Sequence, residues 1–256
     1  MLFPNPFPYP RHPQKLYGDP AKYFKGHDEA KKVAEYRQLI REIARLTGKR
    51  SPSILDVGSG RGELVYAAQL EGLTDVVGLE FAHAMVAYAR DHYRVPLIPQ
   101  TIEAFAATTD RTFDAVVLNA VLEHVYNPAS IMQVCARLTT VGSILFIDTP
   151  NEPNLLTVLG NAMNRIRRSD AVYNLSPTWV PYHVFGFNSR ALRVLLEKYT
   201  FEVIRLRIHA SPLIPSQSNL KDRLAAFIGT QVGHLANISR TASNMYVWAR
   251  RCAAHG

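Results

Sequence analysis

The sequence predicts an α/β fold in which a mostly parallel β-sheet carries helices on both faces. Two observations lead to this prediction. Short apolar runs alternate with helical patterns from residue 53 to residue 148. The runs are apolar along most of their length, which is typical of strands buried on both faces. Alternating strands and helices form a parallel sheet sandwiched between helical layers.

The chain begins with an irregular arm and a helix. Residues 1–27 hold six prolines and several aromatic residues, so they are not expected to join the sheet. The segment from Asp28 to Gly48 places Val33, Tyr36 and Ile40 on one stripe, which predicts an amphipathic helix. We therefore expect an N-terminal arm and capping helix over 1–49 and a main domain over 50–256.

The strands and helices of the first half follow in a regular order. Strands are predicted at 53–57, 75–80, 95–100, 113–119 and 142–148, and helices at 62–71, 82–92, 103–107 and 128–139.

The second half is less regular. The expected elements are helices near 155–167 and over 189–199, a strand at 201–210, a helical insertion at about 219–236 and a final strand at 243–251. The last two strands lie close together in sequence, which suggests an antiparallel edge. The long irregular segments at about 149–186 and 211–242 are expected to act as lids rather than linkers.

Composition limits the class of protein. The chain has 256 residues, 47% of them hydrophobic, and a net charge of +8. No apolar run approaches the roughly 18 to 20 residues of a membrane helix, so a cytoplasmic location is expected. Cys135 and Cys252 lie far apart in sequence, which argues against redox or zinc chemistry. The basic residues are scattered, so the charge predicts a solvated surface more readily than a nucleic-acid site.

The run ILDVGSGRG at 54–62 indicates a ligand site. Gly58, Gly60 and Gly62 follow a buried strand and permit a tight turn at the carboxyl end of the sheet, where open α/β folds bind ligands. Glu80 ends the next strand, where a carboxylate can accept hydrogen bonds from both hydroxyls of a ribose. The pattern therefore predicts a nucleoside.

The spacing disfavours a dinucleotide or a nucleotide phosphate. Counted from Gly58, the third position of G-x-G-x-x-G falls on Glu63, whose bulk and charge oppose a pyrophosphate. The chain has no G-x-x-x-x-G-K-[ST] run. A cofactor that joins adenosine to an amino acid fits better, because Asp56 and Glu63 lie near the expected place of an ammonium group.

The runs ILDVGSGRGE, VVGLEFAHAMVAYAR, FDAVVLNAVLEHVYNP and GSILFIDTPN stand in the order and at the spacing of a known family. From about residue 50 to residue 210 the chain resembles the class I S-adenosylmethionine-dependent methyltransferases. The resemblance implies S-adenosyl-L-methionine as cofactor. It also implies a Rossmann-like sheet of seven strands in the order 3-2-1-4-5-7-6, in which only the last strand is antiparallel.

The resemblance also implies roles for individual residues. Gly58 and Gly60 would face the methionine part of the cofactor with Asp56 nearby, although Asp56 could equally brace the loop. Glu80 would hold the ribose and Phe81 would pack against adenine. The remaining implied cofactor-binding residues are Thr101 and Ile102 at the adenine edge and Asn119, whose carbonyl would meet the ammonium group.

Two later runs narrow the resemblance. VLEHVYNP at 121–128 and PYHVFGFNSRALRVLLEKYTFEV at 181–203 are similar to small-molecule methyltransferases that include the ubiquinone-biosynthesis O-methyltransferases. That branch implies a metal bound in part by an acidic residue shortly before a Glu-His pair, but Ala120 stands at that position before Glu123-His124, so no metal site is predicted. Amino-group methyltransferases carry [DN]-P-P-[FYW], where this chain has Asn119-Ala120-Val121-Leu122.

Transfer to a hydroxyl group needs a base, and histidine suits that task near neutral pH. His124 lies just after the fourth strand and His183 lies in the first lid. We expect His124 to be the catalytic base, with His183 as the second candidate. Each can instead have a purely structural role, His124 in its loop and His183 in packing between lid and sheet.

The acceptor is less well defined. Tyr17, Tyr23 and Phe24 of the arm are expected to close over the cofactor. A small-molecule acceptor such as a sugar, quinone or lipid is the leading interpretation. The alternatives are an RNA or protein acceptor and a noncatalytic nucleotide-binding module. The arginines at 165, 167 and 168 suggest contact with an anionic membrane or phosphate, or a solvated helix face, and the insertion at 211–242 suggests a substrate cover or a homodimer contact.

Overall fold

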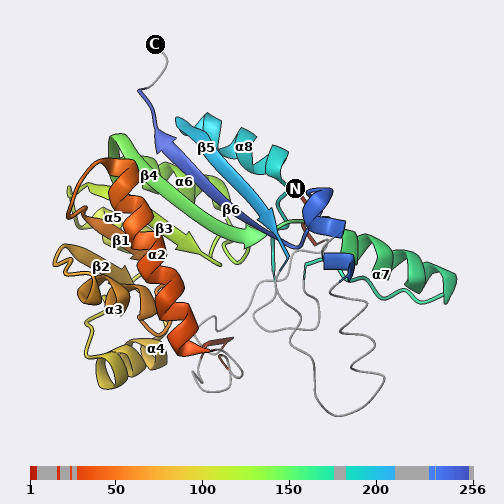
Figure 1. Cartoon of the computed structure of the whole chain (residues 1–256), viewed down its shortest axis with the longest axis horizontal. Helices are drawn as coiled ribbons and strands as arrows, with labels where there is room; N and C mark the ends of the chain where they lie inside the picture. The colour runs from red at the N-terminus through yellow and green to blue at the C-terminus, as the bar shows by residue number, and fades with distance from the viewer. Residues whose placement is uncertain are drawn as a thin grey trace.

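The computed structural model describes residues 1–4, 16–17, 24, 28–175, 183–210, 231–233 and 235–253. These residues form a six-stranded sheet in the order β2-β1-β3-β4-β6-β5, with helices on both faces (Figure 1). The strands are β1 (Ile54–Val57), β2 (Val76–Leu79), β3 (Phe113–Asn119), β4 (Thr139–Pro150), β5 (Phe201–His209) and β6 (Asn244–Arg251). The helices are α2 (Glu29–Thr47), α3 (Glu63–Leu70), α4 (His83–Tyr88), the π-helical turn η2 (Ala89–Tyr93), α5 (Ile102–Ala107), α6 (Pro128–Arg137), α7 (Leu155–Ile166) and α8 (Ser189–Lys198).

The sheet confirms the predicted α/β class and most of the predicted strand order. Strands β2, β1, β3 and β4 pair in parallel. Only β6 runs the other way, antiparallel to both β4 and β5. Because β6 opposes both neighbours, β5 points in the same direction as the four parallel strands. The carboxyl ends of five strands therefore face one edge of the sheet.

The predicted count of seven strands was wrong, because the segment at 95–100 forms only an isolated bridge. Ile98 pairs with Leu79, accepting from the Glu80 N–H at 3.0 Å and donating to the Gly78 carbonyl at 2.9 Å. Pro96 and Pro99 flank it. Proline has no N–H to donate to a ladder, so pairing cannot extend beyond this residue.

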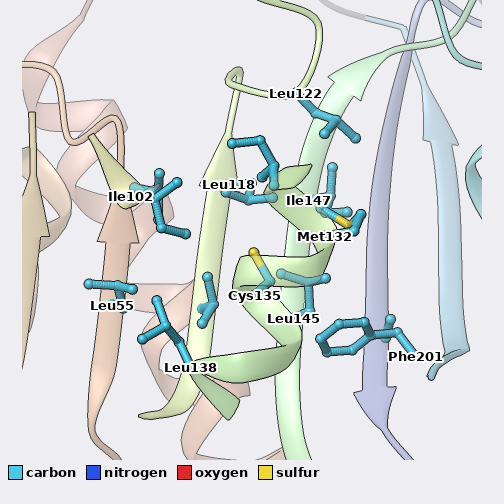
Figure 2. Close-up of a cluster of buried hydrophobic side chains, with 14 of the residues drawn as sticks. Leu55, Ile102, Leu118, Leu122, Met132, Cys135, Leu138, Leu145, Ile147 and Phe201 are labelled. Atoms are coloured by element: carbon cyan, nitrogen blue, oxygen red, sulfur yellow. The ribbon is translucent and has the colours of Figure 1, made fainter. Parts of the chain in front are cut away.

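The core is divided between the two faces of the sheet. On one face, side chains of β1, β3 and β4 pack against α5, α6 and α8 in a continuous cluster, part of which Figure 2 shows between the sheet and α6. On the other face, alternate residues of the same strands pack against α2 and α3. Burial on both faces explains why the strands are apolar along most of their length.

Helix α2 confirms the amphipathic helix predicted from Asp28 to Gly48. The Asp28 carboxylate caps its first turn by accepting from the Lys31 N–H at 3.0 Å, and Gly48 ends it in the left-handed conformation with φ of 68°. Leu39, Ile40 and Ile43 are buried against the sheet. α2 therefore covers one face of the sheet. Alternate residues of a strand point to the same face, so Asp56, Asn119 and Asp148 point to this face at the carboxyl edge.

The two predicted lid segments are described to different extents. In the first, α7 extends away from the sheet (Figure 1), and the stretch around Gly186 pairs with Leu2. Most of the second, at 211–230, lies outside the described residues. In the part of the chain that the structure describes, no helix combines the length and apolar character needed to span a bilayer.

Candidate active site

The glycine-rich loop after β1 forms the predicted tight turn. Gly58 and Gly60 adopt φ values of 67° and 54°, which residues with a side chain rarely adopt. A Cβ on Gly58 would lie 2.8 Å from Val121 Cγ2, and one on Gly60 would lie 3.3 Å from Phe24 Cζ. Neighbouring protein atoms are therefore part of the reason why positions 58 and 60 require glycine. The loops after β1 and β3 and the N-terminal arm meet at this point.

Glu80 joins the loops that follow β1 and β2. Its two carboxylate oxygens accept hydrogen bonds from the Gly60 N–H at 2.9 Å and the Ala82 N–H at 2.8 Å. The side chain is buried, and burial raises its pKa above the ordinary value. Glu80 thus links the loops at two adjacent strand ends, where the sequence analysis placed the ribose.

Further carboxyl groups lie along the same edge. Burial, together with the nearby carboxylates of Glu63 and Glu80, raises the pKa of Asp56 to about 7. Burial also raises the pKa of Asp148, near the end of β4, to about 7, with the charge of Glu123 adding to the effect. Buried carboxylates that lack a salt bridge favour a cationic ligand. The edge is therefore suited to a positively charged molecule.

Asn119 is held by a residue whose role the sequence analysis missed. Its side-chain N–H donates to the Tyr36 hydroxyl of α2 at 3.0 Å. Burial and then the charge of Asp56 raise the pKa of Tyr36 well above its ordinary value. The sequence assigned Tyr36 only to the buried stripe of α2. Asp148 was also missed. It follows the apolar run GSILFI, just as Asp56 follows the apolar residues Ile54 and Leu55.

Arg61, inside the glycine-rich run, was a third omission. It is buried, and its guanidinium group donates to Glu63 at 2.6 Å and to Glu29 at 2.7 Å. The group also lies 4.2 Å from the centroid of the Phe24 ring. Arg61 therefore neutralises Glu63, which cannot offer the free negative charge that the sequence analysis gave it. The bulk of the Glu63 side chain at the start of α3 remains an obstacle to a pyrophosphate.

The other predicted cofactor residues occupy different environments. Thr101 caps α5, its hydroxyl accepting from the Ala104 N–H at 3.3 Å. The Ile102 side chain is buried in the core cluster (Figure 2). Phe81 lies at the crevice and meets Tyr17 edge to face, with ring centroids 5.3 Å apart.

The arm contacts the strand-end loops at two places. Tyr17 contacts Phe81, and Phe24 lies over Gly60 and Arg61. These contacts agree with the expectation that aromatic residues of the arm cover the cofactor region. Tyr23, named with them, lies outside the described residues.

The structure brings His124 and His183 together. Their ring centroids are 5.0 Å apart and the rings are tilted by 69°. The contact is fixed by the backbone, because the Glu123 carbonyl accepts from the N–H groups of Val184 and Phe185 at 2.8 Å and 3.2 Å. Burial, and then His124, lowers the pKa of His183 to about 4. Its Nδ1 atom is buried without a hydrogen-bond partner among the described residues.

Glu123 completes a group of three possible metal ligands. One ligand atom from each of Glu123, His124 and His183 lies within 4.8 Å of the others. Glu123 is buried, burial raises its pKa to about 7, and its Oε2 accepts from the Thr149 hydroxyl at 3.1 Å. Ala120 supplies no second carboxylate, so this donor set fits an imidazole-binding cation such as Zn²⁺ or Fe²⁺ better than Mg²⁺.

The comparisons with known proteins agree with this geometry. A family described as "Methyltransferase domain" matches residues 30–206. This chain belongs to that family. The ubiquinone biosynthesis O-methyltransferase of Azotobacter vinelandii is 36% identical to it over 129 residues, which is 47% of this chain and 54% of that protein. The enzyme of the same name from Hahella chejuensis is 35% identical over 139 residues, 51% of this chain and 57% of that protein. The methyltransferase thus spans about half the length of these relatives.

Solved structures show the same fold. A SAM-dependent methyltransferase from Archaeoglobus fulgidus is similar with a TM-score of 0.59 and 16% identity, covering 90% of this chain and 97% of that one. Magnesium protoporphyrin IX methyltransferase from Synechocystis PCC 6803, solved with bound SAH, has a TM-score of 0.54 and 16% identity over 93% and 92% of the two chains. The methyltransferase therefore has the fold of the S-adenosylmethionine-dependent class, whose cofactor is S-adenosyl-L-methionine.

The residues at the strand ends fit that cofactor. It carries a sulfonium and an ammonium group, and Asp56, Glu80 and Asp148 form no ion pair with a described Lys or Arg residue. No phosphate has to be accommodated beside these acids. Asp56, Glu80 and Asn119, each proposed separately from the sequence, lie at or next to the carboxyl ends of three adjacent strands.

We predict that Asp56→Asn stabilises the ligand-free methyltransferase in a pH-dependent way. The pKa of Asp56 is raised in the folded state, so its contribution to stability is present below pH 4 and is lost as pH rises to about 7. The asparagine variant avoids this loss. Its gain in unfolding free energy at pH 8 should exceed that at pH 5 by roughly 2 to 3 kcal/mol in urea titrations.

The matched control is Asp110→Asn, which alters an exposed aspartate outside the crevice. Its effect should be the same at both pH values. If Asp56→Asn also shows equal effects at pH 5 and pH 8, the raised pKa is disproved.

Proposed function

We propose that this methyltransferase transfers the methyl group of S-adenosyl-L-methionine to a hydroxyl group of a small molecule. The observation that carries the proposal is the pair His124 and His183 beside the acidic edge. The two rings are in contact, and the loop that bears His124 also places Val121 against Gly58. A proton acceptor and the cofactor crevice are therefore built from the same segment of chain.

The relatives named ubiquinone biosynthesis O-methyltransferase support a hydroxyl acceptor. The missing [DN]-P-P-[FYW] run after β3 argues against an amino group. A quinone precursor, sugar or lipid would suit the site. An RNA or protein acceptor is the second candidate, favoured only by the net charge of +8, and salt-dependent RNA binding would support it.

The bound cofactor supplies a methyl group on a sulfonium with a neutral thioether as leaving group. The protein has to align the acceptor, exclude water and remove a proton. In our proposal, Asp56 and Asp148 attract the cationic groups, and Glu80 accepts hydrogen bonds from the ribose. Phe81, Thr101 and Ile102 would border adenine, with the Ile102 side chain supporting that wall from the core.

His124 is the proposed base that takes the hydroxyl proton. His183 is neutral at pH 7, because its pKa is lowered to about 4. In our proposal the neutral His183 packs against His124 and orients its ring. A metal held by Glu123, His124 and His183 would instead lower the pKa of a bound hydroxyl group.

Calorimetry tests the cofactor assignment. Wild-type protein should bind S-adenosylhomocysteine and not NADH. Glu80→Gln should weaken S-adenosylhomocysteine binding by about 10- to 100-fold, because an amide keeps one acceptor oxygen and loses the charge. Glu202→Gln, an exposed glutamate on β5, should have no effect. Binding of NADH in place of S-adenosylhomocysteine would refute the proposal.

Kinetics test the base. His124→Ala should lower kcat on a catechol or hydroxyquinol acceptor by about 10²- to 10⁴-fold, the usual contribution of general-base catalysis. The affinity for S-adenosylhomocysteine should change little. His92→Ala removes a histidine whose side chain is 51% exposed and serves as the control. Unchanged turnover in His124→Ala removes His124 from the mechanism.

We also propose that α7 rests on an anionic lipid surface that supplies or carries the acceptor. Its exposed apolar residues are Leu156, Val158, Leu159, Met163 and Ile166. Arg165, Arg167 and Arg168 lie at or just beyond its end. An apolar helix face flanked by arginines is typical of a helix that lies in a membrane interface.

Sedimentation with phosphatidylglycerol vesicles tests this contact. Met163→Ser with Ile166→Ser should reduce bound protein about tenfold or more, because two exposed apolar side chains lose their burial in lipid. Val141→Ser, an exposed apolar residue at the start of β4, is the control. Equal sedimentation of both variants would exclude α7 as the contact.

A further inference from the structure

A pocket of about 630 Å³ lies beside the edge strand β5. Its walls come from α8, from the carboxyl half of β5 and from residues 237–240. Four arginines line it: Arg190 and Arg193 of α8, Arg207 of β5 and Arg240. Ser189 and Asn237 add polar groups. The scattered basic residues of the sequence are thus gathered at one place by the fold.

The four pocket arginines differ from seven other described arginines, which pair with carboxylates. Arg205, two residues before Arg207, pairs with Glu42 at 2.6 Å, and Arg41 pairs with Glu71 at 2.8 Å. No ion pair with a described carboxylate involves any of the four pocket arginines. Like charges placed together without counter-charges repel one another, and an anionic ligand would relieve that repulsion.

The walls of the pocket are fixed by hydrogen bonds. The Asn237 side-chain oxygen accepts from the Ala210 N–H at 2.8 Å, which ties the end of β5 to the helical residues 235–238. The Asn188 side chain caps α8 by accepting from the Ala191 N–H at 2.9 Å. The Thr241 N–H donates to the Ala236 carbonyl at 2.8 Å and holds the turn that contains Arg240. The backbone positions of the pocket arginines are therefore fixed before a ligand binds.

We propose that this pocket binds the phosphate group of an organic phosphate. The planar guanidinium group donates two parallel hydrogen bonds to a phosphate. The combined positive charge of several arginines matches the multiple negative charge of a phosphate better than the single negative charge of a carboxylate. The volume lies within the range of small-molecule sites, so there is room for more than an inorganic ion. The source is a soluble phosphorylated metabolite or the headgroup of a phospholipid.

The position of the pocket is compatible with the acidic crevice. Leu206, Arg207 and Ile208 are near the carboxyl end of β5, which points to the same sheet edge as β1 to β4. β5 is at one end of the sheet and β2 is at the other. A bound phosphate is thus kept away from the carboxylates of Asp56 and Glu80. The inference does not depend on the identity of the methyl acceptor.

Titration calorimetry of the full chain with inorganic pyrophosphate at fixed ionic strength tests the site. The pocket variant is Arg193→Gln with Arg207→Gln. The control, Arg41→Gln with Arg45→Gln, removes the same charge from two α2 arginines whose side chains are each 61% exposed. We expect saturable binding by wild-type protein, at least tenfold weaker binding by the pocket variant and less than a twofold change in the control.

Vesicle sedimentation then distinguishes the two sources of phosphate. If the pocket variant loses both phosphatidylglycerol binding and pyrophosphate binding, the ligand is a lipid headgroup. Loss of pyrophosphate binding alone identifies a soluble phosphate. Unchanged S-adenosylhomocysteine affinity and thermal unfolding confirm that the variant is folded, and Arg193→Gln and Arg207→Gln are tested singly if it is not. No saturable binding by wild-type protein, or equal losses in pocket variant and control, overturns the proposal.

Discussion

Carboxyl groups that lack a salt bridge at one edge of a parallel sheet are the constraint around which this site is organised. Asp56, Glu80 and Glu123 are buried on or just after β1, β2 and β3, and Asp148 ends the row on β4. Such a row is costly while the groups are ionised. The pKa of about 7 for Asp56, Glu123 and Asp148 and the raised pKa of Glu80 reflect that cost. A cationic ligand offsets it. The same electrostatics that weaken the empty fold therefore favour the cofactor of this family.

Local patterns in the sequence predicted most of the fold. Continuous apolar runs and helical periodicity identified β1 to β6 and the helices that alternate with them, because burial of both sheet faces leaves a local trace. The missing strand shows the limit of that reasoning. The run VPLIPQ has the apolar character of a strand, but Pro96 and Pro99 leave Ile98 as the one residue that pairs with the β2 segment.

The position of a candidate site residue was predictable where it follows from a place at a strand end. Glu80 and Asn119 belong to that group. Arg61, Tyr36 and Phe24 do not, because their roles arise from contacts with residues distant in sequence: Arg61 with Glu29, Tyr36 with Asn119 and Phe24 with Gly60. Arg61 also changes the chemistry of its neighbour, since it neutralises Glu63. The pairing of His124 with His183 likewise depends on how residues 183–187 dock on the loop after β3.

The two hydrogen bonds that Glu80 accepts from Gly60 and Ala82 have a kinetic consequence. Each carboxylate oxygen has a second lone pair, so an incoming diol can add its hydrogen bonds without displacing the backbone donors. The strand-end loops are consequently preorganised, so the ribose binding that we propose at Glu80 requires little rearrangement of these two loops. Any slow closing step would then belong to segments other than these two loops.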